Sequence, residues 1–238
     1  MIENKLYDAM LRLADPTQAE GLSRFFRCGP GQYGEGDRFL GIKVPATRKV
    51  VKELWSECRE ANLDSCLASP WHEVRLAALL VVVQKFHHAR KNAAEQQYWV
   101  DYYLAHTTAI NNWDLVDLTC YEIVGTWLLD KDAGLLREMA QHGASLWEQR
   151  IAMVSTMQFL RHGRLDDTYE IADILLHHSH DLIQKAVGWM LREAGKRDGQ
   201  RLRRWLASRY AGMPRTMLRY AIEKFPPDER QRYLKGLI

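Results

Sequence analysis

Apolar residues recur at every third or fourth position through most of the chain, which is the spacing of amphipathic helices. From Pro45 onward this pattern predicts one helix after another, joined by short connectors. The predicted helices cover residues 45–57, 63–68, 71–87, 93–106, 112–129, 132–141, 145–161, 166–177, 181–196, 200–210, 214–225 and 228–234. No segment alternates apolar and polar residues around an Asn-Gly or Asp-Gly turn. The sequence therefore predicts an all-α protein.

The N-terminal part of the chain has a different pattern. Residues 4–13 and 17–27 predict two short amphipathic helices, within a capping region of about residues 3–27. Residues 28–39 hold four glycines and a proline, a composition that excludes regular structure and predicts a loop. We expect a single domain over residues 1–238, in which the capping helices and the glycine-rich loop precede helical repeats at about residues 45–235.

Four of the predicted helices are weakly similar to one another. Aligning their apolar positions places four charged residues in one column, at intervals of 42, 33 and 35 residues: Arg75, Asp117, Arg150 and Lys185. Repeats of this length built from paired helices are typical of α-solenoids of the HEAT or armadillo kind, in which equivalent positions line one concave face. The predicted fold is an α-α superhelix of HEAT-like repeats, and Asp117 is the acidic member of a basic column.

Trp113 and Asp117 are the most distinctive pair in the sequence. Four residues apart on a helix, they point into the same space, whereas Asp114 points elsewhere. Later repeats also combine indoles with cations, at Trp147, Arg150, Lys185, Trp189 and Arg192. Tryptophan faces beside a carboxylate form a receptor for a cationic planar group. The alternative is a set of core tryptophans beside a surface aspartate, and the pattern alone leaves both interpretations open.

Charge is distributed unevenly along a chain whose net charge is only +3. Residues 185–238 contain 14 Lys or Arg against 5 Asp or Glu, so this segment carries +9 and the rest of the chain −6. Such a field attracts polyanions, nucleic acid first among them, through binding that weakens as salt rises. A solvated helix surface is the alternative explanation.

Several classes of protein are disfavoured by what the sequence lacks. The longest uncharged apolar run, residues 76–83, is too short for a membrane span, and no signal-peptide pattern precedes it. The four cysteines form no CxxC pair, so we expect reduced thiols and no metal site. No GxSxG, P-loop or GxGxxG motif occurs. We expect a cytoplasmic monomer that has no cofactor and no membrane association.

Four motifs taken together resemble a known family. They are GIKVP at residues 41–45, WDLVD at 113–117, LWEQR at 146–150 and IQKAVGWMLRE at 183–193. In this order, over nearly the whole chain, they are similar to the bacterial AlkD-type DNA alkylation repair family of 3-methyladenine and 7-methylguanine DNA glycosylases. The resemblance implies a HEAT-like solenoid that holds duplex DNA and excises alkylated purines without flipping the base into a pocket, in base excision repair.

The resemblance also implies roles for individual residues. Asp117 corresponds to the catalytic aspartate of the family, and Trp113 and Trp189 to its tryptophans at the damaged nucleotide. Arg150 corresponds to an arginine that contacts the DNA backbone. We further expect DNA contacts from Lys43, Trp147, Lys185 and Arg192. The main alternative is a non-catalytic HEAT-like module that binds nucleic acid or a protein partner, and an RNA-binding repeat protein ranks below it because the repeat spacing is irregular.

Overall fold

The computed structural model describes residues 4–238 and confirms the all-α class. Within this range it contains fourteen α-helices and no strand, apart from an isolated bridge between Arg38 and Trp71. The chain forms two compact units, the first ending at Thr119 and the second beginning at Cys120. The single repeat domain stays a prediction, and Glu3, where the capping region was expected to begin, lies outside the described residues.

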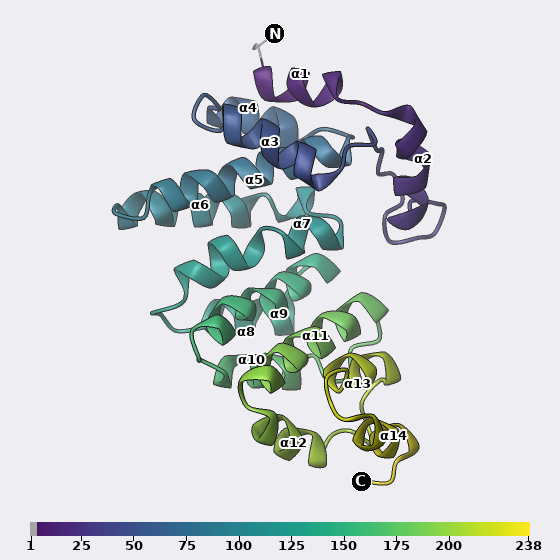
Figure 1. The fold of residues 1–238 in the computed structure, drawn as a ribbon. Helices are drawn as coiled ribbons and strands as arrows, with labels where there is room; N and C mark the ends of the chain where they lie inside the picture. The colour runs from purple at the N-terminus through teal and green to yellow at the C-terminus, as the bar shows by residue number, and fades with distance from the viewer. Residues whose placement is uncertain (1–3) are drawn as a thin grey trace. The chain divides into compact units, whose positions relative to one another are not determined.

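The first unit is arranged around one long apolar helix (Figure 1). Its elements are α1 (Lys5–Arg12), α2 (Pro16–Phe25), α3 (Val44–Leu54), α4 (Glu60–Leu67), α5 (His72–His88), α6 (Ala93–Ala105), the 3₁₀ turn η1 (Thr107–Ala109) and α7 (Trp113–Asp117). Helix α5 contacts α1, α3, α4, α6 and α7, and 13 of its 17 residues are buried. A helix that is apolar on all sides is stable only when neighbours surround it in this way.

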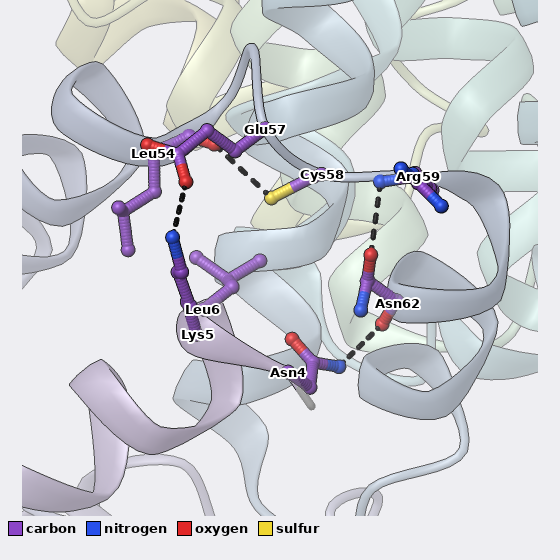
Figure 2. Close-up of a pocket in the computed structure, with 8 residues that line it drawn as sticks. All are labelled: Asn4, Lys5, Leu6, Leu54, Glu57, Cys58, Arg59 and Asn62. Carbon is purple, nitrogen blue, oxygen red and sulfur yellow. Dashed lines mark hydrogen bonds and ion pairs between the residues drawn. The ribbon is translucent and has the colours of Figure 1, made fainter. Parts of the chain in front are cut away.

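Helix α1 covers one side of this unit. Its apolar face carries Leu6 and Met10, both fully buried, and its first turn is tied to the neighbouring helices. Lys5 Nζ lies 2.7 Å from a Glu57 carboxylate oxygen, and Asn4 Nδ2 donates to the Asn62 carbonyl over 2.9 Å. These side chains line a cavity of about 210 Å³ (Figure 2). Its polar groups largely bond to one another, so the cavity is explained by the docking of α1.

The second unit consists of stacked helix pairs. Its elements are the π-helical turn η2 (Tyr121–Gly125), α8 (Gly134–His142), α9 (Leu146–Arg161), α10 (Asp166–Ile174), α11 (Asp181–Arg197), α12 (Gly199–Ala207), α13 (Arg215–Ala221) and α14 (Pro227–Lys235). Helix α9 packs against α8, α10 and α11, and α11 packs against α10, α12 and α13 (Figure 1). This regular order of neighbours is the one expected of HEAT-like repeats.

A glycine sets the distance between two of these helices. A Cβ added at Gly188 in α11 would lie 2.5 Å from the Met217 carbonyl oxygen and 2.5 Å from the Tyr220 Cβ. Real side chains do not approach so closely, so only glycine allows α11 and α13 to pack at this distance. The residue that follows, Trp189, is half-buried on α11.

The prediction of one continuous helix over residues 112–129 is wrong. Helix α7 ends at Asp117, and η2 begins four residues later. The Thr119 hydroxyl donates a hydrogen bond to the Leu115 carbonyl over 2.5 Å. In a continuing helix this carbonyl would accept from the Thr119 N–H. That N–H bonds to the Val116 carbonyl instead. Such back-bonding by threonine bends or interrupts helices. Elsewhere the helix ends differ from the predictions by up to four residues, because boundaries are the part of a helix that a sequence pattern determines least.

Candidate functional site

A largely apolar cavity lies within the first unit. It has a volume of about 390 Å³ and is bordered by α2, the segment 39–45, the start of α5 and α7. Two of the residues singled out by the sequence, Trp113 and Asp117, line it together, and so does Lys43. The remaining lining residues are Leu22, Phe25, Phe26, Phe39, Ile42, Val44, Pro45, His72, Glu73, Leu76, Asp114 and Leu118.

Trp113 and Asp117 stand at the two ends of α7, one helical turn apart and both half-buried. The side chain of Asn112 caps the helix by accepting from the Trp113 N–H at 2.9 Å. The indole of Trp113 stacks on Phe26, with centroids 5.1 Å apart and 22° between the planes, and makes a T-shaped contact with Phe25, with centroids 5.8 Å apart. The predicted pair therefore does share one cavity, where aromatic rings from the end of α2 hold the indole in place.

A buried charged cluster lies next to this pair. His72 Nδ1 is 3.1 Å from Asp37 and its Nε2 is 2.8 Å from Asp114, while Arg75 donates to Asp37 at 2.6 Å. Asn111 also donates to Asp37, over 2.7 Å. Burial alone lowers the pKa of His72, but the hydrogen bonds and charges of the two carboxylates outweigh it and raise that pKa to about 9. The ring is therefore an imidazolium at neutral pH.

Glu73 holds the backbone that leads to Lys43. The residue is 2% exposed, and its carboxylate accepts hydrogen bonds from the N–H groups of Leu40 at 2.9 Å, Gly41 at 2.9 Å and Ile42 at 3.0 Å. Gly41 has a φ of +89°, and a Cβ there would lie 2.0 Å from the Asp15 carbonyl oxygen. This explains the glycine of the GIKVP motif physically. Lys43 follows at the N-cap of α3, exposed at the cavity edge.

The second unit contains the other predicted site residues. Trp147 and Trp189 are half-buried on α9 and α11. Arg150 is 5% exposed and donates to the Leu182 carbonyl over 2.5 Å, so its guanidinium joins α9 to the start of α11. Lys185 pairs with Asp181 at 2.6 Å. Arg192 donates to Glu223 of the segment after α13.

The basic C-terminal segment is partly neutralised by neighbouring helices. Arg203 pairs with Glu229 at 2.6 Å, Arg209 pairs with Asp173 at 2.6 Å, and Arg201 pairs with Asp166. Arg204 and Arg219 are exposed. The charge excess noted in the sequence is therefore only partly available at the surface.

Residues 4–238 contain no cluster of three or more His, Cys, Asp or Glu that is placed to hold a metal ion. None of the helices in this range is both long and apolar enough to cross a membrane.

Sequence reasoning missed several residues of this site. Phe25, Phe26 and Phe39 are brought to Trp113 and His72 by long-range packing. The partners of His72 and Glu73 likewise lie more than thirty residues away in the sequence. One signal was available, because the apolar helix α5 opens with His72, Glu73 and Arg75, and charged residues in a buried helix need partners.

A family model and a solved structure are similar to this chain. A family model described as DNA alkylation repair enzyme matches residues 6–225. The structure is also similar to that of a predicted DNA alkylation repair enzyme from Enterococcus faecalis, with a TM-score of 0.66 and 17% sequence identity, covering 90% of this chain and 97% of the other. At this identity the structural likeness shows a shared fold. No curated protein matches the sequence.

Proposed function

The chain belongs to the DNA alkylation repair enzyme family, and on that basis we propose that it is a monofunctional DNA glycosylase. It hydrolyses the N-glycosidic bond of purines that alkylation at N3 or N7 has made cationic, such as 3-methyladenine and 7-methylguanine, in duplex DNA. As in the AlkD-type enzymes that the sequence resembles, the base is not flipped into a pocket. The observation that carries the proposal is the placement of Trp113 and Asp117 on one turn of α7, facing one cavity.

The chemistry of such a lesion suits a single carboxylate. A purine alkylated at N3 or N7 leaves as a neutral base, so no general acid is needed to protonate it. As the glycosidic bond lengthens, positive charge develops on the sugar. A carboxylate can stabilise that oxocarbenium ion and orient the attacking water, as it does in glycoside hydrolysis. Asp117 takes this role in the proposal.

Tryptophan faces add to the same effect. An indole attracts a cation by roughly 0.5–2 kcal/mol, depending on how dry the site is. Trp113 is fixed by Phe25 and Phe26, so its indole can contact a substrate without a large loss of side-chain entropy. The second tryptophan in the proposal is Trp189, and its assignment rests on the family motif in residues 183–193.

The side chains to which we assign DNA contacts differ in exposure and in their present partners. Lys43 is exposed at the cavity edge, where a phosphate can reach it. Lys185 and Arg192 are paired with carboxylates, which a phosphate can replace as partner. The proposed contact of Arg150 rests on the sequence resemblance, because its side chain is buried. Trp147 is assigned to the DNA-facing set on the same basis.

The charge of the lesion provides the test. Purified protein is incubated with duplexes that contain either one 7-methylguanine or one hypoxanthine, and free base is quantified by mass spectrometry. We expect release of 7-methylguanine and no release of hypoxanthine, because the uncharged base must be protonated to leave and the proposed mechanism includes no general acid. Equal release of both bases contradicts the mechanism. Release of neither, with duplex binding intact, supports the non-catalytic binding module instead.

A further inference from the structure

The buried cluster around His72 has no part in the chemistry proposed above. Its four charged members are 9% exposed or less: Asp37, His72, Arg75 and Asp114. Burying an ionic group is costly unless its charge and hydrogen bonds are satisfied, and such clusters often fix a geometry more than they add stability. We therefore examine which segments of the chain the cluster holds in place.

His72 is not placed to touch a substrate. Both ring nitrogens are occupied, one by Asp37 and the other by Asp114. The ring also stacks on Phe39 at 4.6 Å and lies against Phe26 at 5.0 Å, and the residue is only 1% exposed. A group enclosed in this way has no free donor or acceptor to offer to DNA.

The cluster joins three segments that are distant in sequence. Asp37 belongs to the glycine-rich loop, His72 and Arg75 belong to the first turn of α5, and Asp114 belongs to α7. Asn111, just before α7, donates to Asp37 and accepts from Arg75 at 2.9 Å. The entry to α7 is thus bonded to both other segments.

Helix α7 depends on such outside contacts. It has only five residues, far fewer than an isolated helix needs to be stable. Asp114 follows Trp113 directly and lies three residues before Asp117, so the bond to His72 acts inside the same turn. Any rotation of α7 about its axis would break this bond and turn both proposed catalytic residues.

We propose that His72 is a positioning residue, which holds α7 through Asp114 so that Trp113 and Asp117 face the cavity. This inference rests on the function proposed above for that pair. The imidazolium is the form that can donate to both carboxylates at once, because a neutral ring has only one N–H. When the ring loses a proton, one of the two bonds is lost and the remaining bond is no longer strengthened by the positive charge of the ring, so the hold on α7 weakens.

The surroundings of His72 contain a thiol, that of Cys28, which could also ionise during a titration toward high pH. The charged or titratable side chains that belong to the cluster, line the same cavity or lie close to Asp37 are Cys28, Asp37, Lys43, Glu73, Arg75, Asp114 and Asp117. Burial and the nearby Asp37 raise the pKa of the Cys28 thiol above its ordinary value. Cys28→Ser removes that group and is therefore a required control.

The test follows the environment of Trp113 directly. The protein is labelled with 5-fluorotryptophan, and the signal of Trp113, among those of eight tryptophans, is identified by its loss in Trp113→Phe. In a ¹⁹F NMR titration of the wild type and of Cys28→Ser, the Trp113 signal should shift with a midpoint near pH 9. In Asp114→Asn, which removes one carboxylate, the midpoint should fall by at least one pH unit. A Trp113 signal that does not respond between pH 7 and 10 overturns the inference.

Base release supplies the second readout. At neutral pH, Asp114→Asn should lower the single-turnover rate on 7-methylguanine duplex by about 10–100-fold, the scale of a small misplacement of catalytic groups, while duplex affinity changes by less than twofold. His88→Gln, at the exposed opposite end of α5, should leave both unchanged. A full rate in Asp114→Asn overturns the inference even if the wild type is a glycosylase. If neither the wild type nor any variant releases base, the NMR titration still decides whether His72 positions α7.

Discussion

Glu73 is a single buried carboxylate that bonds to three consecutive backbone N–H groups. A loop that passes close to a helix needs acceptors for these groups, because buried N–H groups without partners are costly. Glu73 meets this need for residues 40–42 and so fixes the point where Lys43 leaves the buried segment. The same side chain explains why an acidic residue occurs in the first turn of an otherwise apolar helix.

Glu73→Gln should therefore destabilise the protein. The amide keeps one oxygen acceptor but turns an NH₂ group toward one of the three donors, which leaves that backbone N–H without a partner. We expect the free energy of unfolding to fall by about 1–3 kcal/mol, measured by urea denaturation. The matched control is Glu53→Gln on α3, whose side chain is exposed, and it should change stability by less than 0.5 kcal/mol, roughly the surface average. Equal stability of Glu73→Gln and wild type contradicts this account.

At this scale, the sequence indicated residue types better than partners. Trp113 and Asp117 could be paired because helix spacing is a local rule. The aromatic support from Phe25, Phe26 and Phe39 could not be predicted, since it depends on how the segment 26–39 folds back. The burial of Arg150 was missed for a similar reason. Its acceptor, the Leu182 carbonyl, lies one repeat further along the chain.

Helix α7 and the π-helical turn η2 replace what the hydrophobic pattern predicted as one helix. Leu115, Val116, Ile123 and Val124 are all fully buried, so the apolar signal itself was correct. The interruption comes from hydrogen bonding, which a hydrophobic pattern does not report. The Thr119 hydroxyl donates to the Leu115 carbonyl, and the Thr126 hydroxyl donates to the Tyr121 carbonyl five residues earlier. π-helical turns are rare and often occur near functional sites.

Close packing at Gly188 gives a prediction for the repeats. Gly188→Ala would force a methyl group against the backbone of α13, so we expect a loss of about 1–3 kcal/mol of stability from overpacking. Gly21→Ala is the matched comparison, because a Cβ there meets no atom within 4 Å. Replacing glycine inside a helix should then stabilise the protein by about 0.5–1 kcal/mol. Thermal denaturation followed by circular dichroism measures both, and a neutral Gly188→Ala would contradict the packing argument.

For the whole molecule, the fold class followed from the period of the hydrophobic pattern and from the absence of turn signals for strands. The match of the family model over residues 6–225 agrees with the four motifs that spread over nearly the whole chain. The charge distribution was less informative. Arg201, Arg203 and Arg209 look available in the sequence, yet each pairs with a carboxylate on another helix. Surface charge depends on such pairings, which are not local in sequence.

We propose that this chain breaks a glycosidic bond and that Asp117 is the group responsible. The most direct measurement is single-turnover release of 7-methylguanine from methylated duplex DNA by the wild type, Asp117→Asn and Asp130→Asn. Asp130 is an exposed aspartate outside the cavity and serves as the matched control. We predict that the wild type and Asp130→Asn release the base at the same rate. In Asp117→Asn the release should be slower by roughly 10²–10³-fold, the scale for removing one preorganised electrostatic group. Duplex binding should change little. An Asp117→Asn protein that works at the wild-type rate would contradict the account.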